Sequence, residues 1–303
     1  MHLDAIGELF SKSWSLYVKR FKSLILIYLP PLALIIIGEV LQARQTIPAL
    51  FVGSILMFLA IILSVAAGIA LITAINKGTD FIESYQAGFK LFWAWIWIAI
   101  LAELAMIGGF VMFIIPGIML SIQLALAIYV LVLEDKHGMQ ALIQSREYVK
   151  GYWWAYFGRA LLLCLVICVL MFVAYLPFAL LLGKVAALII YGIVLLCAVP
   201  FAMCYSYEIF DNFRRLKPNA GENAAKDKHE FLTVAMVFGA IGIVAGIILF
   251  FAALAFFPAL ILMDARYNLS SNTINSPYYN ITRGYTETST IGGTEWQPTS
   301  TSQ

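Results

Sequence analysis

Four polar side chains interrupt otherwise apolar stretches of this 303-residue sequence, and their types are those that do chemistry inside a membrane. Glu39 and Glu103 supply carboxyl groups, Gln123 an amide and Arg159 a guanidinium. A charge at bilayer depth costs about 2.5–3.5 kcal/mol on insertion scales, so such groups are commonly functional. Glu103 is the strongest candidate because the other residues from Ala99 to Ile107 are all apolar. It is either a proton or cation site or a protonated carboxyl hydrogen-bonded to a neighbouring helix.

The other three polar residues have simpler interpretations. Glu39 lies near the end of its apolar stretch, where it can reach the lipid headgroups or pair with Arg44. Arg159 lies one or two turns from the end of its stretch and can extend to the interface. Gln123 is of the type that more often bridges two helices than binds a substrate.

Glu134 and Asp135 with His137 form the one acidic and histidine cluster that resembles a metal site. The remaining histidines, His2 and His229, are far away in the sequence, and the cluster falls in a short turn where acids are usually solvated. The sequence contains no glycine-rich phosphate loop, Gly-x-Ser-x-Gly or His-Glu-x-x-His motif. We therefore expect no metal, no cofactor and no enzymatic activity.

The amino-acid composition predicts that membrane lipid surrounds much of the chain. The residues are 62% hydrophobic and 12% charged, against about 45–50% and about 25% in soluble domains. The net charge is only +2, and no basic patch with interleaved aromatic residues predicts nucleic-acid binding. The four cysteines lie in apolar runs, where thiols behave as small hydrophobes. Membrane lipids are thus the first expected partner.

Seven apolar stretches are long enough to cross about 30 Å of hydrocarbon, which takes about 20 residues at 1.5 Å each. They run from Phe21 to Leu41, Ile47 to Ile75, Phe92 to Ile115, Pro116 to Leu133, Trp153 to Leu182, Val185 to Ile209, and Phe231 to Met263. The third and fourth adjoin, and we place the reversal at Pro116-Gly117, since proline cannot continue a helix and glycine allows a tight turn. We expect Pro30-Pro31 to kink or restart the first helix.

The distribution of lysine and arginine orients the spans. With the N-terminus in the cytoplasm, the outer segments hold only Arg44, Lys184, Arg266 and Arg283, and the inner segments hold the other 15 of the 19 basic residues. The expected location is the cell membrane, with several passes, a cytoplasmic N-terminus and an extracytoplasmic C-terminal tail.

Amphipathic segments precede three of the spans, at Leu3–Phe21, Asp80–Phe92 and Met139–Tyr152. The apolar positions of the first recur every three or four residues, at Leu3, Ile6, Phe10, Trp14, Tyr17 and Phe21. This spacing predicts a helix that lies in the cytoplasmic membrane interface with its aromatic face towards lipid.

The three segments are similar enough to suggest an internal repeat of an interfacial helix followed by a transmembrane hairpin. The matched positions are Lys19-Arg20-Phe21, Lys90-Leu91-Phe92 and Lys150-Gly151-Tyr152, with Ser13, Ser84 and Ser145 upstream. Chance and shared interface chemistry are the alternative explanation, because interfaces favour Trp, Tyr and Lys in any membrane protein.

The chain after the sixth span changes character twice. We predict a six-helix domain over residues 1–210, a charged cytoplasmic linker over 211–230, a seventh helix over 231–263 and a disordered polar tail over 264–303. The seventh helix carries Gly239, Gly242 and Gly246, small residues that allow close helix approach. They pack either on the six-helix domain or on another chain, as a membrane partner or a second copy.

A set of short motifs lies between residues 108 and 163: Ile115-Pro116-Gly117, Val132-Leu133-Glu134, Ser145-Arg146, and Gly151 with Trp153-Trp154. In these motifs the chain resembles a large family of uncharacterised six-helix membrane proteins, which includes the membrane domain fused to some glycerophosphoryl diester phosphodiesterases. The resemblance extends over residues 1–210 and implies the membrane module only, since the soluble hydrolase barrel has no counterpart here. Gln123 departs from the family, which often has a basic residue there.

The expected fold is an all-α, polytopic integral membrane bundle of about seven transmembrane helices with three cytoplasmic interfacial helices. For function we favour a non-enzymatic accessory or scaffold protein that acts on lipids or membrane partners. A transporter or channel that uses Glu103 and Gln123, with proline-broken helices lining a path, is the alternative. An intramembrane enzyme is the third class, and it lacks a group of catalytic residues at one depth.

Overall fold

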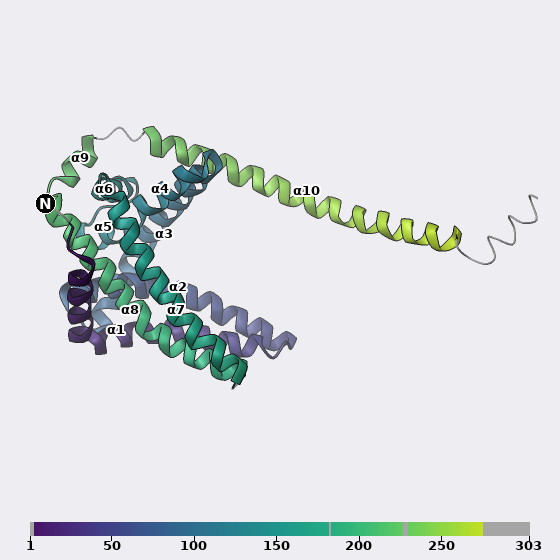
Figure 1. Cartoon of the computed structure of the whole chain (residues 1–303), viewed down its shortest axis with the longest axis horizontal. Coiled ribbons are helices and arrows are strands. Elements are labelled where there is room, and N and C mark those ends of the chain that lie inside the picture. The colour runs from purple at the N-terminus through teal and green to yellow at the C-terminus, as the bar shows by residue number, and fades with distance from the viewer. Residues whose placement is uncertain (1–2, 182, 227–229, 275–303) are drawn as a thin grey trace, which may run out of the picture. The chain divides into compact units, whose positions relative to one another are not determined.

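The computed structural model describes residues 3–181, 183–226 and 230–274, and in this part of the chain the regular secondary structure is α-helical (Figure 1). The helices are α1 (Ile6–Gln42), α2 (Ile47–Lys77), α3 (Phe81–Met112), α4 (Ile114–Leu124), α5 (Ala127–Glu134), α6 (Met139–Val149), α7 (Trp153–Leu181), α8 (Lys184–Leu216), α9 (Ala220–Lys226) and α10 (Glu230–Ile274). Seven helical stretches are long and apolar enough to cross a membrane, with α4 and α5 together forming the fourth. The prediction of an all-α, multi-pass membrane protein is confirmed.

The chain divides into two compact units, of which the first ends at Gly242 and the second begins at Ile243, within α10. The first unit has two hydrophobic cores. One surrounds α5 and α6 and includes the fully buried Leu131, Leu142 and Phe213. The other lies along α1 and α2, around Leu24 and Leu71. These cores hold together the helix ends that carry most of the polar side chains.

The first predicted amphipathic segment is part of α1 rather than a separate helix. Lys19, Arg20, Phe21 and Lys22 are ordinary helix formers with no breaker among them, so helical hydrogen bonding continues into the span. The 37 residues of α1 measure about 55 Å, well beyond the about 30 Å of hydrocarbon. In Figure 1 its darkest, N-terminal part runs in a different direction from the later part, which packs beside α2. Pro30 and Pro31 lie inside α1, and the helix does not restart there.

The second amphipathic segment is likewise the beginning of α3, whereas the third forms a separate helix, α6. The difference follows from one position of the proposed repeat. Arg20 and Leu91 continue their helices, but Gly151 adopts a φ of +85°, which ends the helical path before α7 begins at Trp153. The prediction of three separate interfacial helices is therefore wrong for two of them, and α6 is buried within the fold on most of its surface.

The reversal between the third and fourth spans occurs at Phe113, three residues before the predicted turn. Phe113 is extended, with φ −164° and ψ 155°, between the end of α3 and the start of α4. Pro116 lies in the first turn of α4, where its missing N–H has no helical partner to lose. Gly117 does not form a turn. It allows α4 to pack closely on α3, because a Cβ on Gly109 would lie 2.9 Å from the Gly117 Cα.

The predicted linker and tail are both more helical than expected. Residues 211–216 complete α8, where Phe213 is fully buried, and Ala220–Lys226 forms α9. α10 continues past Met263 to Ile274, because Asp264, Ala265 and Arg266 are compatible with a helix although they are not apolar. Residues 275–303 of the predicted tail lie outside the described part of the chain.

Candidate functional site

The intramembrane candidates do not form one site. Glu103 is exposed on α3, and Gln123 is half-buried on α4. Neither of them lines the basic cavity at the α1, α2 and α3 ends or the cavities around Met57, Cys164 and Lys90. Glu39 is exposed too, and no ion pair joins it to Arg44 among the described residues. A shared cavity or relay through these groups is not seen in this part of the structure.

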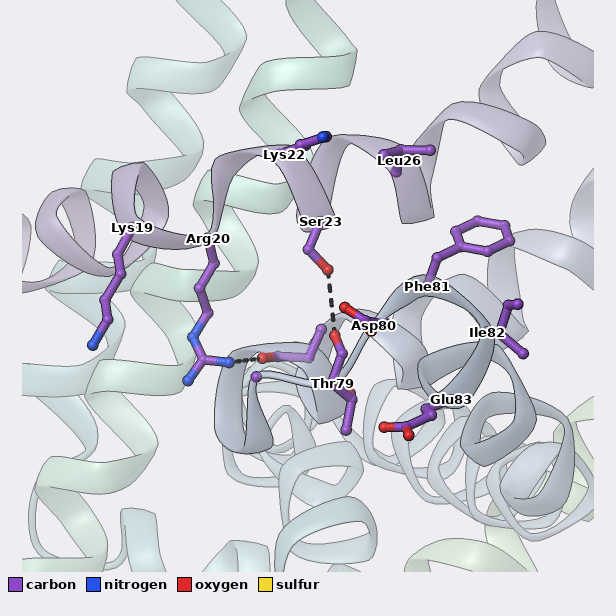
Figure 2. Close-up of a pocket in the computed structure, with 12 residues that line it drawn as sticks. Lys19, Arg20, Lys22, Ser23, Leu26, Thr79, Asp80, Phe81, Ile82 and Glu83 are labelled. Carbon is purple, nitrogen blue, oxygen red and sulfur yellow. Dashed lines mark hydrogen bonds between the residues drawn. The ribbon is translucent and has the colours of Figure 1, made fainter.

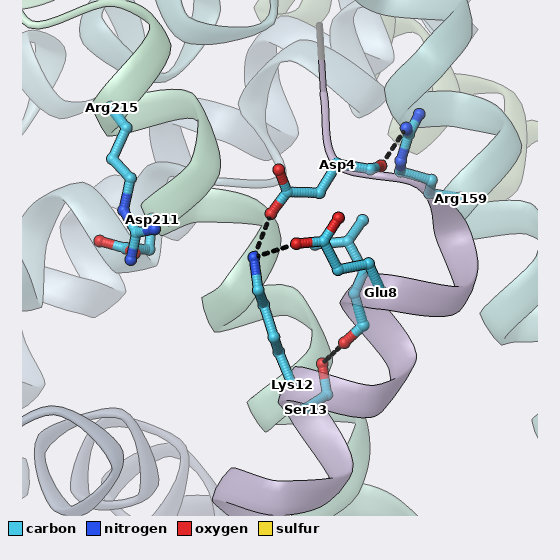
Figure 3. A network of polar contacts seen from close by, with 8 residues as sticks. Asp4, Glu8, Lys12, Ser13, Arg159, Asp211 and Arg215 are labelled. Carbon is cyan, nitrogen blue, oxygen red and sulfur yellow. Dashed lines mark hydrogen bonds and ion pairs between the residues drawn. The ribbon is translucent and has the colours of Figure 1, made fainter.

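Arg159 has partners within the chain, which its sequence position did not predict. Its Nη2 donates a hydrogen bond to the Asp4 carbonyl oxygen at 2.7 Å (Figure 3). Its Nη1 donates to the Ala155 carbonyl at 2.8 Å. The guanidinium therefore binds the N-terminal segment to α7 and does not extend freely to the interface. Backbone carbonyls are usual partners for a cation at membrane depth, where water is scarce.

The same N-terminal segment carries a small charge network. Lys12 Nζ lies 2.7 Å from Asp4 Oδ2 and 2.8 Å from Glu8 Oε1 (Figure 3). The hydrogen bond from Lys12 lowers the pKa of the Asp4 carboxyl, with a smaller contribution from Asn212 on α8. Asp4 thus connects the beginning of the chain to α7 through its carbonyl oxygen and to α1 through its carboxylate.

Glu134 is the centre of a second polar cluster, between α5, α6 and α8. The Tyr148 hydroxyl donates to Glu134 Oε1 at 2.6 Å, the Gln144 side-chain amide donates to Oε2, and Arg214 Nε lies 3.8 Å from Oε1. The Glu134 side chain is only 11% exposed. Burial, followed by this hydrogen bond, raises the pKa of Tyr148. Glu134 is occupied by protein donors, and the described residues contain no group of three metal-binding side chains.

Further contacts hold α6 in place. The Ser145 hydroxyl donates to the Gln123 carbonyl oxygen at 2.6 Å, so the two segments are joined through the Gln123 backbone. The Lys217 ammonium donates to the carbonyls of Glu147 and Lys150 at the end of α6, and burial lowers the pKa of Lys217. Two of the motif residues that carried the family resemblance, Glu134 and Ser145, thus help to hold α6 in place.

Equivalent positions of the proposed repeat share one property. Ser13, Ser84 and Ser145 are all completely buried. Their hydroxyls contact polar groups in the chain: Ser13 donates to the Leu9 carbonyl at 2.6 Å, and Ser84 lies 2.7 Å from the Thr79 hydroxyl. Burial is thus common to the three serines, and the repeat itself stays a prediction.

Glycines bring α3 and the first part of α10 into backbone contact inside the first unit. A Cβ added to Gly108 would lie 1.6 Å from the Ala235 carbonyl oxygen, and one added to Gly239 would lie 1.9 Å from the Leu104 carbonyl oxygen. Gly242 faces Val111 in the same way, at 2.7 Å. Two of the three predicted packing glycines thus pack on α3, while Gly246 belongs to the second unit and its packing stays a prediction. Sequence reasoning missed Gly108 as the partner, although the Gly108-Gly109 pair was visible.

A basic cavity of about 970 Å³ lies where residues 19–26 of α1 meet the end of α2 and the beginning of α3. We call it the basic cavity; its lining consists of Lys19, Arg20, Lys22, Ser23, Leu26, Ala74, Gly78, Thr79, Asp80, Phe81, Ile82 and Glu83. Figure 2 shows Arg20 reaching across to the α2 end, where its Nη1 donates to the Ala74 carbonyl. Gly78 has a φ of +74° and lies directly against the guanidinium. Ser23 donates to the Thr79 carbonyl at 3.4 Å.

The lining residues are only partly separated by type. Lys19 and Arg20 lie together on one side, Lys22 lies apart from them, and Leu26, Phe81 and Ile82 lie on the other side together with Glu83 (Figure 2). Sequence reasoning used these cations to orient the spans, as the polar side of the first amphipathic segment and as repeat positions, and it did not predict a cavity. The density of charge from Lys19 to Lys22 was the available clue, but its partner segment, residues 78–83, lies more than 50 residues away.

The sequence matches no protein-family model, no curated protein and no solved structure. The resemblance to the six-helix membrane family therefore stays a prediction based on the motifs between residues 108 and 163.

Proposed function

We propose that this protein is a non-enzymatic, multi-pass protein of the cell membrane that acts as an accessory or scaffold protein by organising anionic lipids. In this proposal the N-terminus and the basic cavity face the cytoplasm, as the distribution of lysine and arginine predicts. The observation that carries the proposal is the amphipathic surface of the first third of α1, together with the basic cavity beside it.

The first third of α1 has the side-chain distribution of a membrane-surface helix. Phe10, Trp14 and Val18 are about half exposed, at 48%, 52% and 56%, and they follow one another along one face. Lys19 and Lys22 are exposed at the end of this row. Exposed aromatic groups favour the headgroup boundary, and each lysine near an anionic leaflet adds about 1 kcal/mol of attraction.

The polar groups elsewhere support a structural role. Arg159, Glu134 and Lys217 each bind other parts of the chain at the helix ends, which leaves none of the three free to act on a substrate. Such contacts fix the positions of helices, as a scaffold requires.

The experiment is to purify the protein in a mild detergent and to compare its retained phospholipids with those of the membrane it came from. We expect several-fold enrichment of anionic lipids, reduced by high salt and by Phe10→Ser with Trp14→Ser. Leu165→Ser with Val169→Ser is the matched control, because these residues are equally exposed but lie within the α7 span. Retained lipid of the same composition as the bulk membrane would refute the proposal.

Transport through Glu103 and Gln123 remains the alternative function. It predicts a proton flux into liposomes containing the protein, reported by an enclosed pH-sensitive dye, which is lost in Glu103→Gln. A flux of this kind would replace the accessory proposal, whereas identical leakage of wild type and Glu103→Gln would remove the alternative.

A further inference from the structure

We propose that the basic cavity binds the phosphodiester of a single anionic phospholipid, with the phosphate at its cationic side and an acyl chain along its apolar side. This inference rests on the proposed function and specifies its ligand. It concerns a bound lipid, in contrast to the general attraction of lipids to the surface of α1.

The cationic side has the chemistry of a phosphate site. Lys19 and Lys22 are exposed at the cavity, so their ammonium groups are accessible to a ligand. Arg20 is held in position by its hydrogen bond to the Ala74 carbonyl, and its planar guanidinium has five N–H groups, of which this contact uses one. A guanidinium fixed by the protein loses little freedom when it binds an anion.

The beginning of α3 adds an independent contribution. α3 starts at Phe81, and its N-cap residue, Asp80, makes no side-chain hydrogen bond to the first turn. Unsatisfied N–H groups and the positive end of the helix dipole favour an anion at this position. The same residues line the basic cavity, so the helix terminus lies in the same cavity as Lys19 and Arg20, with Lys22 farther along its lining (Figure 2).

The charge of the lining specifies the kind of phosphate. The lining contains three cations, Lys19, Arg20 and Lys22, and two carboxylates, Asp80 and Glu83, which leaves a net charge of +1. A phosphodiester carries one negative charge and balances it, whereas a phosphate monoester with nearly two charges does not. The carboxylates also provide acceptors for headgroup hydroxyl groups. The chemistry therefore fits an anionic phospholipid with a hydroxyl-bearing headgroup, of the phosphatidylglycerol type.

The apolar side indicates a lipid in preference to a soluble phosphate ester. Ile82 is 66% exposed and Leu26 is 43% exposed, and both line the cavity with Phe81. The cavity volume of about 970 Å³ lies within the usual range for small-molecule sites, about 300–1,000 Å³. Because α2 ends at Lys77 and α3 begins at Phe81, the cavity lies at the ends of two spans, at the level expected for headgroups.

The test measures binding of short-chain phosphatidylglycerol, phosphatidylethanolamine and phosphatidylcholine, and of free glycerol phosphate, to the full chain in neutral detergent. Tryptophan fluorescence and native mass spectrometry report the bound ligand. Lys19→Gln with Lys22→Gln removes two cations of the cavity, while Lys90→Gln with Lys136→Gln removes two exposed lysines outside it. Arg20 is left unchanged because it also joins α1 to α2.

We expect the wild type to bind phosphatidylglycerol most tightly and the cavity variant to bind it about tenfold more weakly, with little change in the control variant. Equal losses in both variants would overturn the cavity assignment and indicate diffuse surface charge. Free glycerol phosphate binding as tightly as the lipid would show a soluble phosphate ester site, and equal binding of phosphatidylethanolamine would refute the charge argument. Melting curves without lipid identify any variant that fails to fold.

The outcomes for the two proposals are distinguishable. If wild type shows no preference for anionic lipid in either experiment, the proposed function itself is wrong. If wild type retains anionic lipid and the cavity variant retains it equally, the function stands and only the assignment of this cavity fails.

Discussion

Replacing Gly108 by alanine tests the backbone contact between α3 and α10 most directly. The new Cβ would lie 1.6 Å from the Ala235 carbonyl oxygen, whereas ordinary van der Waals contact begins at 3.4 Å. The carbonyl belongs to the helix backbone and cannot rotate away like a flexible side chain. The two helices must therefore separate by about 1.8 Å at this point.

The cost follows from the contacts that this separation removes. A gap of 0.5–1 Å already forfeits about a quarter to a half of each van der Waals contact, so about 1.8 Å removes most of those between Gly108 and Gly239. Overpacking of this kind typically lowers the free energy of unfolding by about 1–3 kcal/mol. The higher helix propensity of alanine offsets up to about 1 kcal/mol of this loss. We expect a net loss of about 1–2 kcal/mol in the free energy of unfolding, or about 2–8 °C in the melting temperature.

The assay combines melting followed by tryptophan fluorescence with cysteine cross-linking in a cysteine-free background. The pair Val111→Cys and Gly242→Cys reports the same helix contact, because Gly242 faces Val111. Gly158→Ala in α7 is the matched control: no heavy atom within 4 Å among the described residues opposes its Cβ, so it gains helix propensity without a clash. If Gly108→Ala melts like Gly158→Ala and cross-links as efficiently as the parent, the reasoning is refuted.

Three further changes have definite expected outcomes. Ser145→Ala removes the hydrogen bond to the Gln123 carbonyl and should lower the free energy of unfolding by about 1 kcal/mol in denaturant titrations; an unchanged midpoint would contradict this. Gly151→Ala places a side chain at a φ of +85° and should lower the free energy of unfolding by about 1–2 kcal/mol in the same titration; wild-type stability would show that this φ is not required. The bond from Lys12 lowers the pKa of Asp4 below its ordinary 3.8, so its stabilisation is present above that pH and disappears as pH falls through the folded-state pKa. Melting temperatures measured between about pH 6 and 3 should show this loss in wild type, and Asp4→Asn should lack that part of the pH dependence.

The residues at which several helices end are set by tertiary packing, which the local sequence does not encode. Residues 211–216 are polar enough to suggest a linker, yet they complete α8 because Phe213 is buried against the core. Phe113 reverses the chain although Pro116-Gly117 is the stronger local turn pattern. Gly151 is the opposite case, since a single residue type in an otherwise similar repeat separates α6 from α7.

The residues of the candidate sites were individually visible, but their neighbours were not. A carboxyl such as Glu103 is conspicuous in any apolar run, whereas the direction it faces depends on the rotation of α3 about its axis. Contacts between helices set this rotation. For example, Gly88 of α3 packs against Ala66 of α2, and a Cβ on Gly88 would lie 2.4 Å from the Ala66 carbonyl oxygen. Arg159 illustrates the same point, because its partner, Asp4, lies 155 residues away.

The sequence alone determined that this protein is an all-α membrane protein with seven spans, because apolar length and composition are properties of single segments. It also predicted the equivalence of Ser13, Ser84 and Ser145, since a repeat is a comparison within the chain. Only the tertiary structure decided which polar groups act together. Lys19 to Lys22 face residues 78–83 because α1, α2 and α3 pack there, and a cavity formed by distant segments exists only after that packing is known.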